Sequence, residues 1–188
     1  MYKRILLPIF ALVIFYGCAG SKTQPLTNKD LPDWYLNPPR YEDKFVGVGD
    51  ALRPQFNLSK QVATERARVE VARAVETTVT SALNDHMQAS GMGAQAGATE
   101  FTESVSKSLV STTLKGCTIE KTEVFKERVF VMVVYDANKA REEAKAVARA
   151  EAKKEEALYS EFKARQAFDA LDQALDRMKG SSSVSAPE

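Results

Sequence analysis

Small and apolar residues recur with helical spacing over one long stretch of the chain, residues 58–87. They return every three or four positions, which marks one face of a helix. Many of these positions hold alanine, and small side chains let a helix lie close to a sheet or to another helix. The pattern therefore predicts one long helix whose packing face includes Ala63, Ala67, Val71, Val75, Val79 and Leu83.

Three shorter runs, over residues 45–50, 117–126 and 129–136, predict β-strands. The last run is apolar throughout, which is typical of a strand that is central in its sheet or buried on both faces. A tight turn joins it to the run before it. The first run contains Gly47 and Gly49, and glycines within a strand allow close approach of another backbone. We therefore expect an α+β fold with one antiparallel sheet and the long helix packed on it.

A second helix is expected over residues 99–114, and the longest helical stretch follows at 137–178, which contains no glycine or proline. At about 1.5 Å per residue, a straight helix of that length would be ~63 Å long. Because that exceeds the width of a domain of this size, we expect part of it to project or to turn back.

The first half of this stretch carries a basic side chain at every fourth position. Glutamates are interspersed among them, so we interpret the stripe as a solvated helix face. The alternatives are contact with an acidic envelope polymer or lipid headgroup, or with a partner helix. The basic stripe consists of Arg141, Lys145, Arg149 and Lys153.

The second half is more apolar and has residues spaced by three, four or seven positions. This spacing forms a seam of about two to three heptads, short of the number that indicates a coiled coil. Two interpretations stay open: the seam docks back onto its own domain, or it joins another copy as an oligomer seam. The residues in question are Phe168, Leu171, Leu175 and Met178.

The start of the chain has the layout of a secretory signal peptide, with a basic pair, an apolar run over residues 5–16 and a small residue before Cys18. The run is too short to span a hydrocarbon core, which needs about 20 residues. A cut that leaves Cys18 first is typical of bacterial lipoproteins. We therefore expect removal of residues 1–17, acylation of Cys18 and a lipid anchor. Ala19 after the cysteine favours the outer membrane, and an ordinary signal with an incidental cysteine is the alternative.

Composition divides the remainder of the chain. Residues 18–31 are polar and aperiodic, and we expect a flexible tether there. The domain over 32–136 opens with the aromatic and proline-rich segment 32–39, which we expect to pack onto the domain and fix its start. An exposed recognition segment of polyproline type is the alternative. The long helix occupies 137–179, and the Gly/Ser/Pro-rich tail 180–188 is expected to be disordered.

Charge and chemistry narrow the function classes. The formal net charge is +1, and loss of the signal would leave 24 of the 26 basic residues beside all 25 acidic ones, so we predict no nucleic-acid partner. One histidine, His86, and one further cysteine, Cys117, are too few for a zinc site. We interpret Cys117 as a buried small side chain and His86 as a helix-end residue near the last carbonyls. We predict no enzyme, cofactor or metal.

The order of these features is similar to that of the Lpp-twenty outer-membrane lipoproteins. The resemblance covers roughly residues 1–136. The parts that carry it are the signal with Cys18, the segment 32–39 (PDWYLNPP), the strand 45–49 (FVGVG), the Ala/Arg-spaced helix around 63–74 and the apolar strand 129–135.

The resemblance implies a lipoprotein of the outer membrane with a small α+β domain of the dodecin-like or flagellar T-ring-associated kind. Some relatives belong to flagellum-associated envelope structures, and no catalytic residues come with the family. We therefore expect a non-catalytic structural or assembly component that binds itself or another envelope or flagellar protein. The alternative is a lipid-anchored module that binds an envelope polymer or lipid headgroup through the basic stripe.

Overall fold

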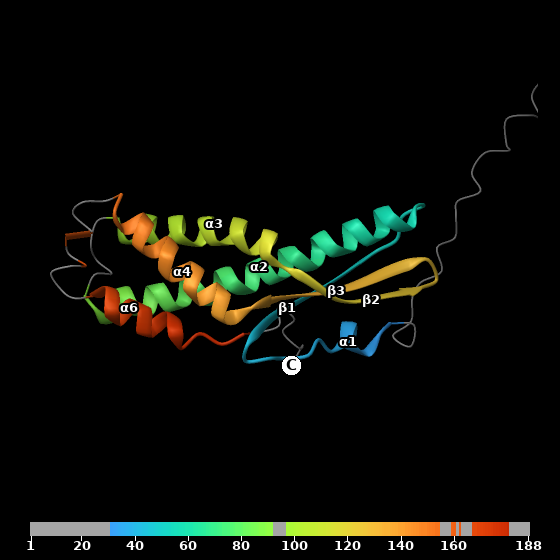
Figure 1. The fold of residues 1–188 in the computed structure, drawn as a ribbon, viewed down its shortest axis with the longest axis horizontal. Coiled ribbons are helices and arrows are strands. Elements are labelled where there is room, and N and C mark those ends of the chain that lie inside the picture. The colour runs from blue at the N-terminus through green and yellow to red at the C-terminus, as the bar shows by residue number, and fades with distance from the viewer. Residues whose placement is uncertain (1–30, 92–96, 155–158, 161, 163–166, 181–188) are drawn as a thin grey trace, which may run out of the picture.

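A three-stranded antiparallel sheet in the order β1-β3-β2 lies at one end of the molecule, and helices extend from it to the other end (Figure 1). The structure is a computed structural model and describes residues 31–91, 97–154, 159–160, 162 and 167–180. The elements are α1 (Asp33–Leu36), β1 (Lys44–Ala51), α2 (Phe56–Ala89), α3 (Ala98–Gly116), β2 (Thr118–Phe125), β3 (Arg128–Asp136), α4 (Ala137–Ala152) and α6 (Ala167–Asp176).

The predicted α+β class, with one small antiparallel sheet, is confirmed. Strand β3 pairs with β1 on one side and β2 on the other, and seven of its nine residues are buried in a continuous run. Its apolar sequence follows from this central position, because α2 covers one face and α1 the other. The hairpin between β2 and β3 turns at Lys126 and Glu127, which both have positive φ, as two-residue hairpin turns require.

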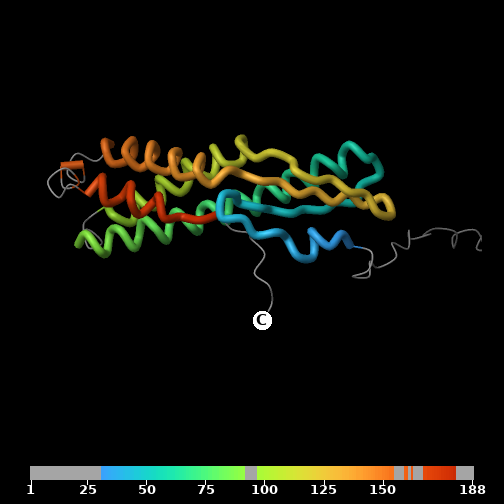
Figure 2. Tube along the Cα trace, turned by 60° about the horizontal axis from the view of Figure 1, so that its bottom comes forward, coloured from blue at the N-terminus to red at the C-terminus, as the bar shows by residue number. Residues whose placement is uncertain are grey.

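Helix α2 contributes to both ends of the molecule. Its 34 residues correspond to about 51 Å at 1.5 Å per residue. Ala63 and Val71, in its first half, pack on the sheet, whereas Leu83 and Met87 lie further along the same buried face. There α3 and α6 pack against the second half of α2, and α4 packs against α3 and α6 (Figures 1 and 2). One helix therefore joins the sheet to the helical end.

Helix α2 lies directly against the backbone of β1 at two glycines. A methyl group on Gly47 would lie 2.3 Å from the backbone oxygen of Ala67, and one on Gly49 would lie 2.3 Å from that of Ala63. Both distances are far below van der Waals contact. The alanines of α2 and the glycines of β1 are thus two halves of one close helix–strand contact, as the sequence predicted.

The single long helix predicted over 137–178 is wrong. Helix α4 ends at Ala152, and α6 lies back along α4 and α2, as Figure 2 shows. The buried face of α4 consists of alanines that pack against α3. A straight continuation would leave Leu171 and Leu175 in water, whereas in the structure both are fully buried. Burial of a leucine side chain is worth about 1.5–3 kcal/mol, which favours the turn back.

His86 lies in the last turn of α2, as predicted, and is buried beneath this fold-back. Its ring lies 6.2 Å from that of Phe162, which also packs against Phe101 and Phe168. Within the described residues, Nε2 of His86 has no hydrogen-bond partner. Burial lowers the pKa of His86, so the folded protein takes up a proton at this ring less readily than the unfolded chain does. The prediction that Cys117 is a buried side chain is confirmed, and burial raises its pKa to about 11.

The aromatic segment at the start of the domain packs onto the sheet, as predicted. It forms a single helical turn, α1, rather than an extended stretch, and the carbonyl of Pro32 accepts from the backbone N–H groups of Tyr35 and Leu36. The ring of Tyr35 meets that of Phe130 edge-on at 5.0 Å. Trp34 Nε1 donates to Glu123 on β2. Segment 32–39 thus closes the face of the sheet opposite α2.

Replacing Gly49 by alanine should destabilise the fold by about 2 kcal/mol or more, because the new methyl group forces α2 away from β1. Urea denaturation followed by circular dichroism measures the change. Thr122→Ala, on exposed strand β2, is the control and should stay within about 0.5 kcal/mol of the parent. Equal small effects of the two changes would contradict the close contact.

Folding stability should fall as the pH drops through the ordinary histidine pKa of 6.5. The folded-state pKa of His86 is lowered, so below that pH the unfolded chain binds a proton that the folded one excludes, at up to about 1.4 kcal/mol per pH unit. His86→Phe should flatten this slope between pH 7.5 and 5.5 in urea denaturation. Contributions of all other groups are common to both proteins, so identical slopes would refute the assignment.

Candidate functional site

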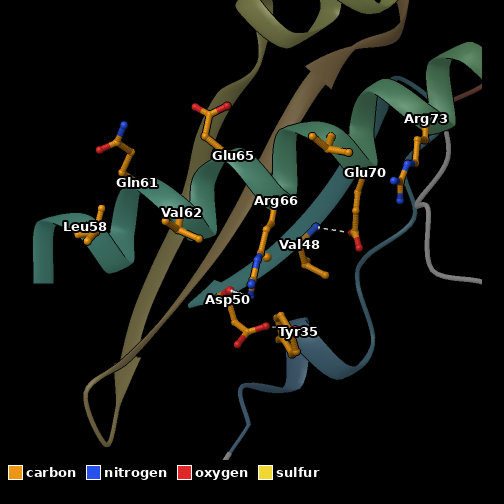
Figure 3. Close-up of a pocket in the computed structure, with 12 residues that line it drawn as sticks. Tyr35, Val48, Asp50, Leu58, Gln61, Val62, Glu65, Arg66, Glu70 and Arg73 are labelled. Carbon is orange, nitrogen blue, oxygen red and sulfur yellow. Dashed lines mark hydrogen bonds between the residues drawn. The ribbon is translucent and has the colours of Figure 1, made fainter. Parts of the chain in front are cut away.

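An open groove of about 660 Å³ runs between α1, β1 and α2 and is shown in Figure 3. Its apolar lining includes Leu58 and Val69, both partly exposed on α2. Its polar lining comes from the same helix and from the outer edge of β1. The groove exists because the glycines of β1 bring α2 so close that helical side chains reach the edge of the strand.

Two side chains of α2 bind backbone groups on the outer edge of β1. Glu70 Oε2 accepts from the backbone N–H of Val48 at 3.1 Å, and Arg66 Nη1 donates to the carbonyl oxygen of Asp50 at 2.7 Å (Figure 3). These are backbone groups that a further strand would otherwise bind.

Asp50 is the central polar residue of the groove. Its Oδ1 accepts from the Tyr35 hydroxyl at 2.7 Å, and its Oδ2 pairs with the guanidinium of Arg128 at the start of β3. Burial, and after it the hydrogen bond to Asp50, raises the pKa of Tyr35, so its hydroxyl stays protonated and acts as a donor. The carboxylate of Asp50 therefore ties α1, β1 and β3 together.

The remaining end of β1 is held by the C-terminal segment. The backbone N–H of Gly180 donates to the carbonyl of Glu42 at 2.9 Å, and a side chain at 180 would collide with the backbone of Lys44. Residue 180, which the sequence assigned to a disordered tail, is thus packed against the domain. Contacts from α2 and from Gly180 lie along the outer side of β1 and close this edge of the sheet.

The opposite edge of the sheet, strand β2, is exposed along its whole length. All eight of its residues are exposed, which no other strand of the sheet shows. Ile119 is 43% exposed, Val124 52% and Phe125 37%, so the strand presents apolar side chains as well as backbone groups to solvent. An exposed edge strand of this length is a template for pairing with another strand.

The basic stripe of α4 faces α6. Arg141 Nε donates to the carbonyl of Met178 at 2.8 Å, Lys145 Nζ lies 2.6 Å from Asp176, and Arg149 pairs with Asp172. Hydrogen bonds, first that to Asp176 and then that to Glu142, raise the pKa of Lys145. Lys153, at the end of α4, is exposed. Lys145 and Arg149 are thus paired with acids of α6, and Arg141 binds the segment that follows α6.

The apolar seam is used inside the protomer. Leu171, Leu175 and Met178 are buried in the main core beside α2 and α4, and Phe168 packs against it. Of the two interpretations left open by the sequence, the structure shows docking back onto the domain. Cys18 and the predicted signal lie outside the described residues.

Comparison with known proteins adds no assignment: no protein-family model and no curated protein matches this chain. In the described residues, no group of three or more His, Cys, Asp or Glu side chains is arranged to hold a metal ion. No helix among those residues is long and apolar enough to cross a membrane.

Sequence reasoning missed both the Asp50 cluster and the exposed edge. The partners of Asp50 lie 15 and 78 residues away in the chain, a separation at which periodicity carries no information. A local sequence signal could have found the exposed edge. Both faces of the run 118–125 carry charged and polar residues among the apolar ones, whereas both faces of the run 129–135 are apolar.

Removal of the Tyr35 hydroxyl in Tyr35→Phe should cost about 1–2 kcal/mol of unfolding free energy, because it deletes a hydrogen bond to a charged and partly buried acceptor. Urea denaturation of the purified protein measures it. Tyr41→Phe is the matched control, since Tyr41 packs against the same hydrophobic cluster as Tyr35. A Tyr35 variant as stable as this control would show that Asp50 does not depend on the hydroxyl.

Proposed function

We propose that this protein is a non-catalytic outer-membrane lipoprotein that works as a structural or assembly component of the cell envelope. The observation that carries the proposal is the exposed edge of β2. In the described residues, two side chains of α2 and the backbone of Gly180 cover the outer edge of β1 and the residues just before it. Every residue of β2, in contrast, is exposed to solvent. A protein that protects one edge and presents the other is suited to binding another polypeptide.

The N-terminal sequence supports an anchored form of this role. A basic pair, a short apolar run and Cys18 have the layout of a lipoprotein signal, and acyl chains at Cys18 would hold the protein at the membrane. The resemblance to Lpp-twenty lipoproteins agrees with this, and we infer from it a dodecin-like or flagellar T-ring-associated variety of the α+β fold. It also suggests an envelope or flagellar setting.

The rival role as a polyanion-binding module is less favoured. It rests on the basic stripe of α4, in which Lys145 and Arg149 are paired with acids of α6 and Arg141 is bound to Met178 just beyond it. An external ligand would have to displace these contacts, whereas the edge of β2 is accessible without rearrangement.

Both parts of the proposal can be tested with the full chain expressed in a Gram-negative cell. A photo-crosslinking residue in place of Thr122 on β2 should capture a protein of the envelope, identified by mass spectrometry. The same residue in place of Thr77, an exposed threonine on α2, should capture at least fivefold less. Equal yields at the two positions would refute assembly through β2.

In the same cells, the parent chain should fractionate with the outer membrane, and Cys18→Ala should leave that fraction because acylation is lost. Outer-membrane recovery of Cys18→Ala equal to the parent's would refute the lipid anchor.

A further inference from the structure

The order of charged side chains along the exposed edge of β2 favours one kind of partner strand. We propose that this edge pairs antiparallel with β2 of a second copy of this chain, with Thr122 of the two copies directly opposite one another. The inference rests on the proposed assembly function and names its partner. The two three-stranded sheets would then form one continuous six-stranded sheet, with the two β2 strands at its centre.

The hydrogen-bonding direction of each residue in β2 follows from the contacts at the other edge. The N–H of Val48 points away from β3 to Glu70, so Val48 and its register partner Met132 form a pair without mutual hydrogen bonds. Met132 therefore turns its N–H and C=O to β2, where its partner is Lys121. Because the direction alternates along a strand, Thr122 and Val124 point their backbone groups to the open edge.

Only residues whose backbone N–H and C=O groups point to the open edge can form hydrogen bonds to a second copy. In a symmetric pairing, each such residue must therefore lie opposite another residue of the same kind. Centring the pair on Thr122 satisfies this condition. It also sets Lys121 opposite Glu123 of the second copy, and Glu123 opposite Lys121, which makes two favourable charge pairs across the two-fold axis. The strand is therefore complementary to itself.

The neighbouring registers are disfavoured by charge. Centring the pair on Lys121 places two lysines directly opposite, and centring it on Glu123 places two glutamates opposite. Like charges facing each other across strands are destabilising. The three-residue pattern Lys121-Thr122-Glu123 thus favours the register centred on Thr122 over its two neighbours.

The position of α1 makes this arrangement compatible with a membrane anchor. In one protomer α1 lies on the face of the sheet opposite α2. A two-fold axis that joins two sheets edge to edge is perpendicular to them, so both α1 helices lie on the same face of the dimer. Residue 31, where the described chain begins next to α1, then lies on one side in both copies. Confinement to one membrane raises the effective concentration of the two edges and favours a pairing as short as this.

A single cysteine at the axis tests the register. Thr122→Cys in the full chain would bring the two Cα atoms of residue 122 to about 5.5 Å, the spacing of a hydrogen-bonded antiparallel pair. That lies within the range of about 4.4–6.8 Å for disulfides. Mild oxidation of membranes should convert most of this variant to a reductant-sensitive dimer. The parent chain, which keeps Cys18 and Cys117, is the reference for any other crosslink.

Val124→Cys is the matched control, because in this register the two copies of residue 124 are four positions apart, or about 13 Å, too far for a disulfide. It should give at least fivefold less dimer than Thr122→Cys. Equal crosslinking of the two variants, or none above the parent at residue 122, would overturn the proposed register.

Charge reversal tests the specificity of the pairing. In the Thr122→Cys background, Lys121→Glu sets glutamate opposite glutamate and should reduce the dimer at least fivefold. Addition of Glu123→Lys should restore it, because the charge pairs are re-formed with opposite sign. Failure of the double change to restore the dimer would overturn the charge-selected register.

A photo-crosslink at residue 122 that yields only a different envelope protein would overturn self-pairing and leave the assembly function standing. Absence of any captured protein at residue 122 would overturn both.

Discussion

The close contact between α2 and β1 sets the geometry of the whole sheet end. Because Gly47 and Gly49 carry no side chains, the backbone of α2 rests directly on the strand, with Ala63 and Ala67 at the points of contact. At this short separation the side chains of Arg66 and Glu70 are long enough to bind backbone groups on the outer edge of β1. Adding a methyl group at either glycine would therefore do more than create a steric clash, since it would also draw both side chains away from the backbone groups that they bind.

The two edges of the sheet are treated in opposite ways, and this contrast is the strongest functional information in the structure. Two side chains of α2, Glu70 and Arg66, bind backbone groups on the edge of β1. The N–H of Gly180 binds the carbonyl of Glu42, just before the strand begins. Such coverage is a usual defence against unwanted strand pairing. Strand β2 is as long as β1 and exposes apolar side chains. An uncovered edge of this kind is a liability in a protein that works alone and an asset in one that assembles.

Sequence periodicity predicted those elements whose burial pattern is visible within their own residues. The 3.6-residue spacing of α2 and the apolar run of β3 predicted a long helix on a central strand, and the glycines of β1 predicted the close contact. It failed at the turn after Ala152, because no glycine or proline marks it and the local sequence favours helix. What bends the chain there is the burial of Leu171 and Leu175, a tertiary effect. The Asp50 cluster was equally out of reach, since it joins residues from three separate elements.

The fold-back of α6 also changes where assembly can take place. Two of the surfaces that the sequence offered for partners, the basic stripe and the apolar seam, lie in the C-terminal helices. In the structure they satisfy each other: Lys145 and Arg149 bind acids of α6, while Leu171 and Leu175 fill the space between α6 and the rest of the core. Association through the seam would require α6 to detach and to expose these leucines, at about 1.5–3 kcal/mol for each side chain. Pairing through β2 requires no such opening, so the sheet end is the more accessible of these surfaces for the assembly that we propose.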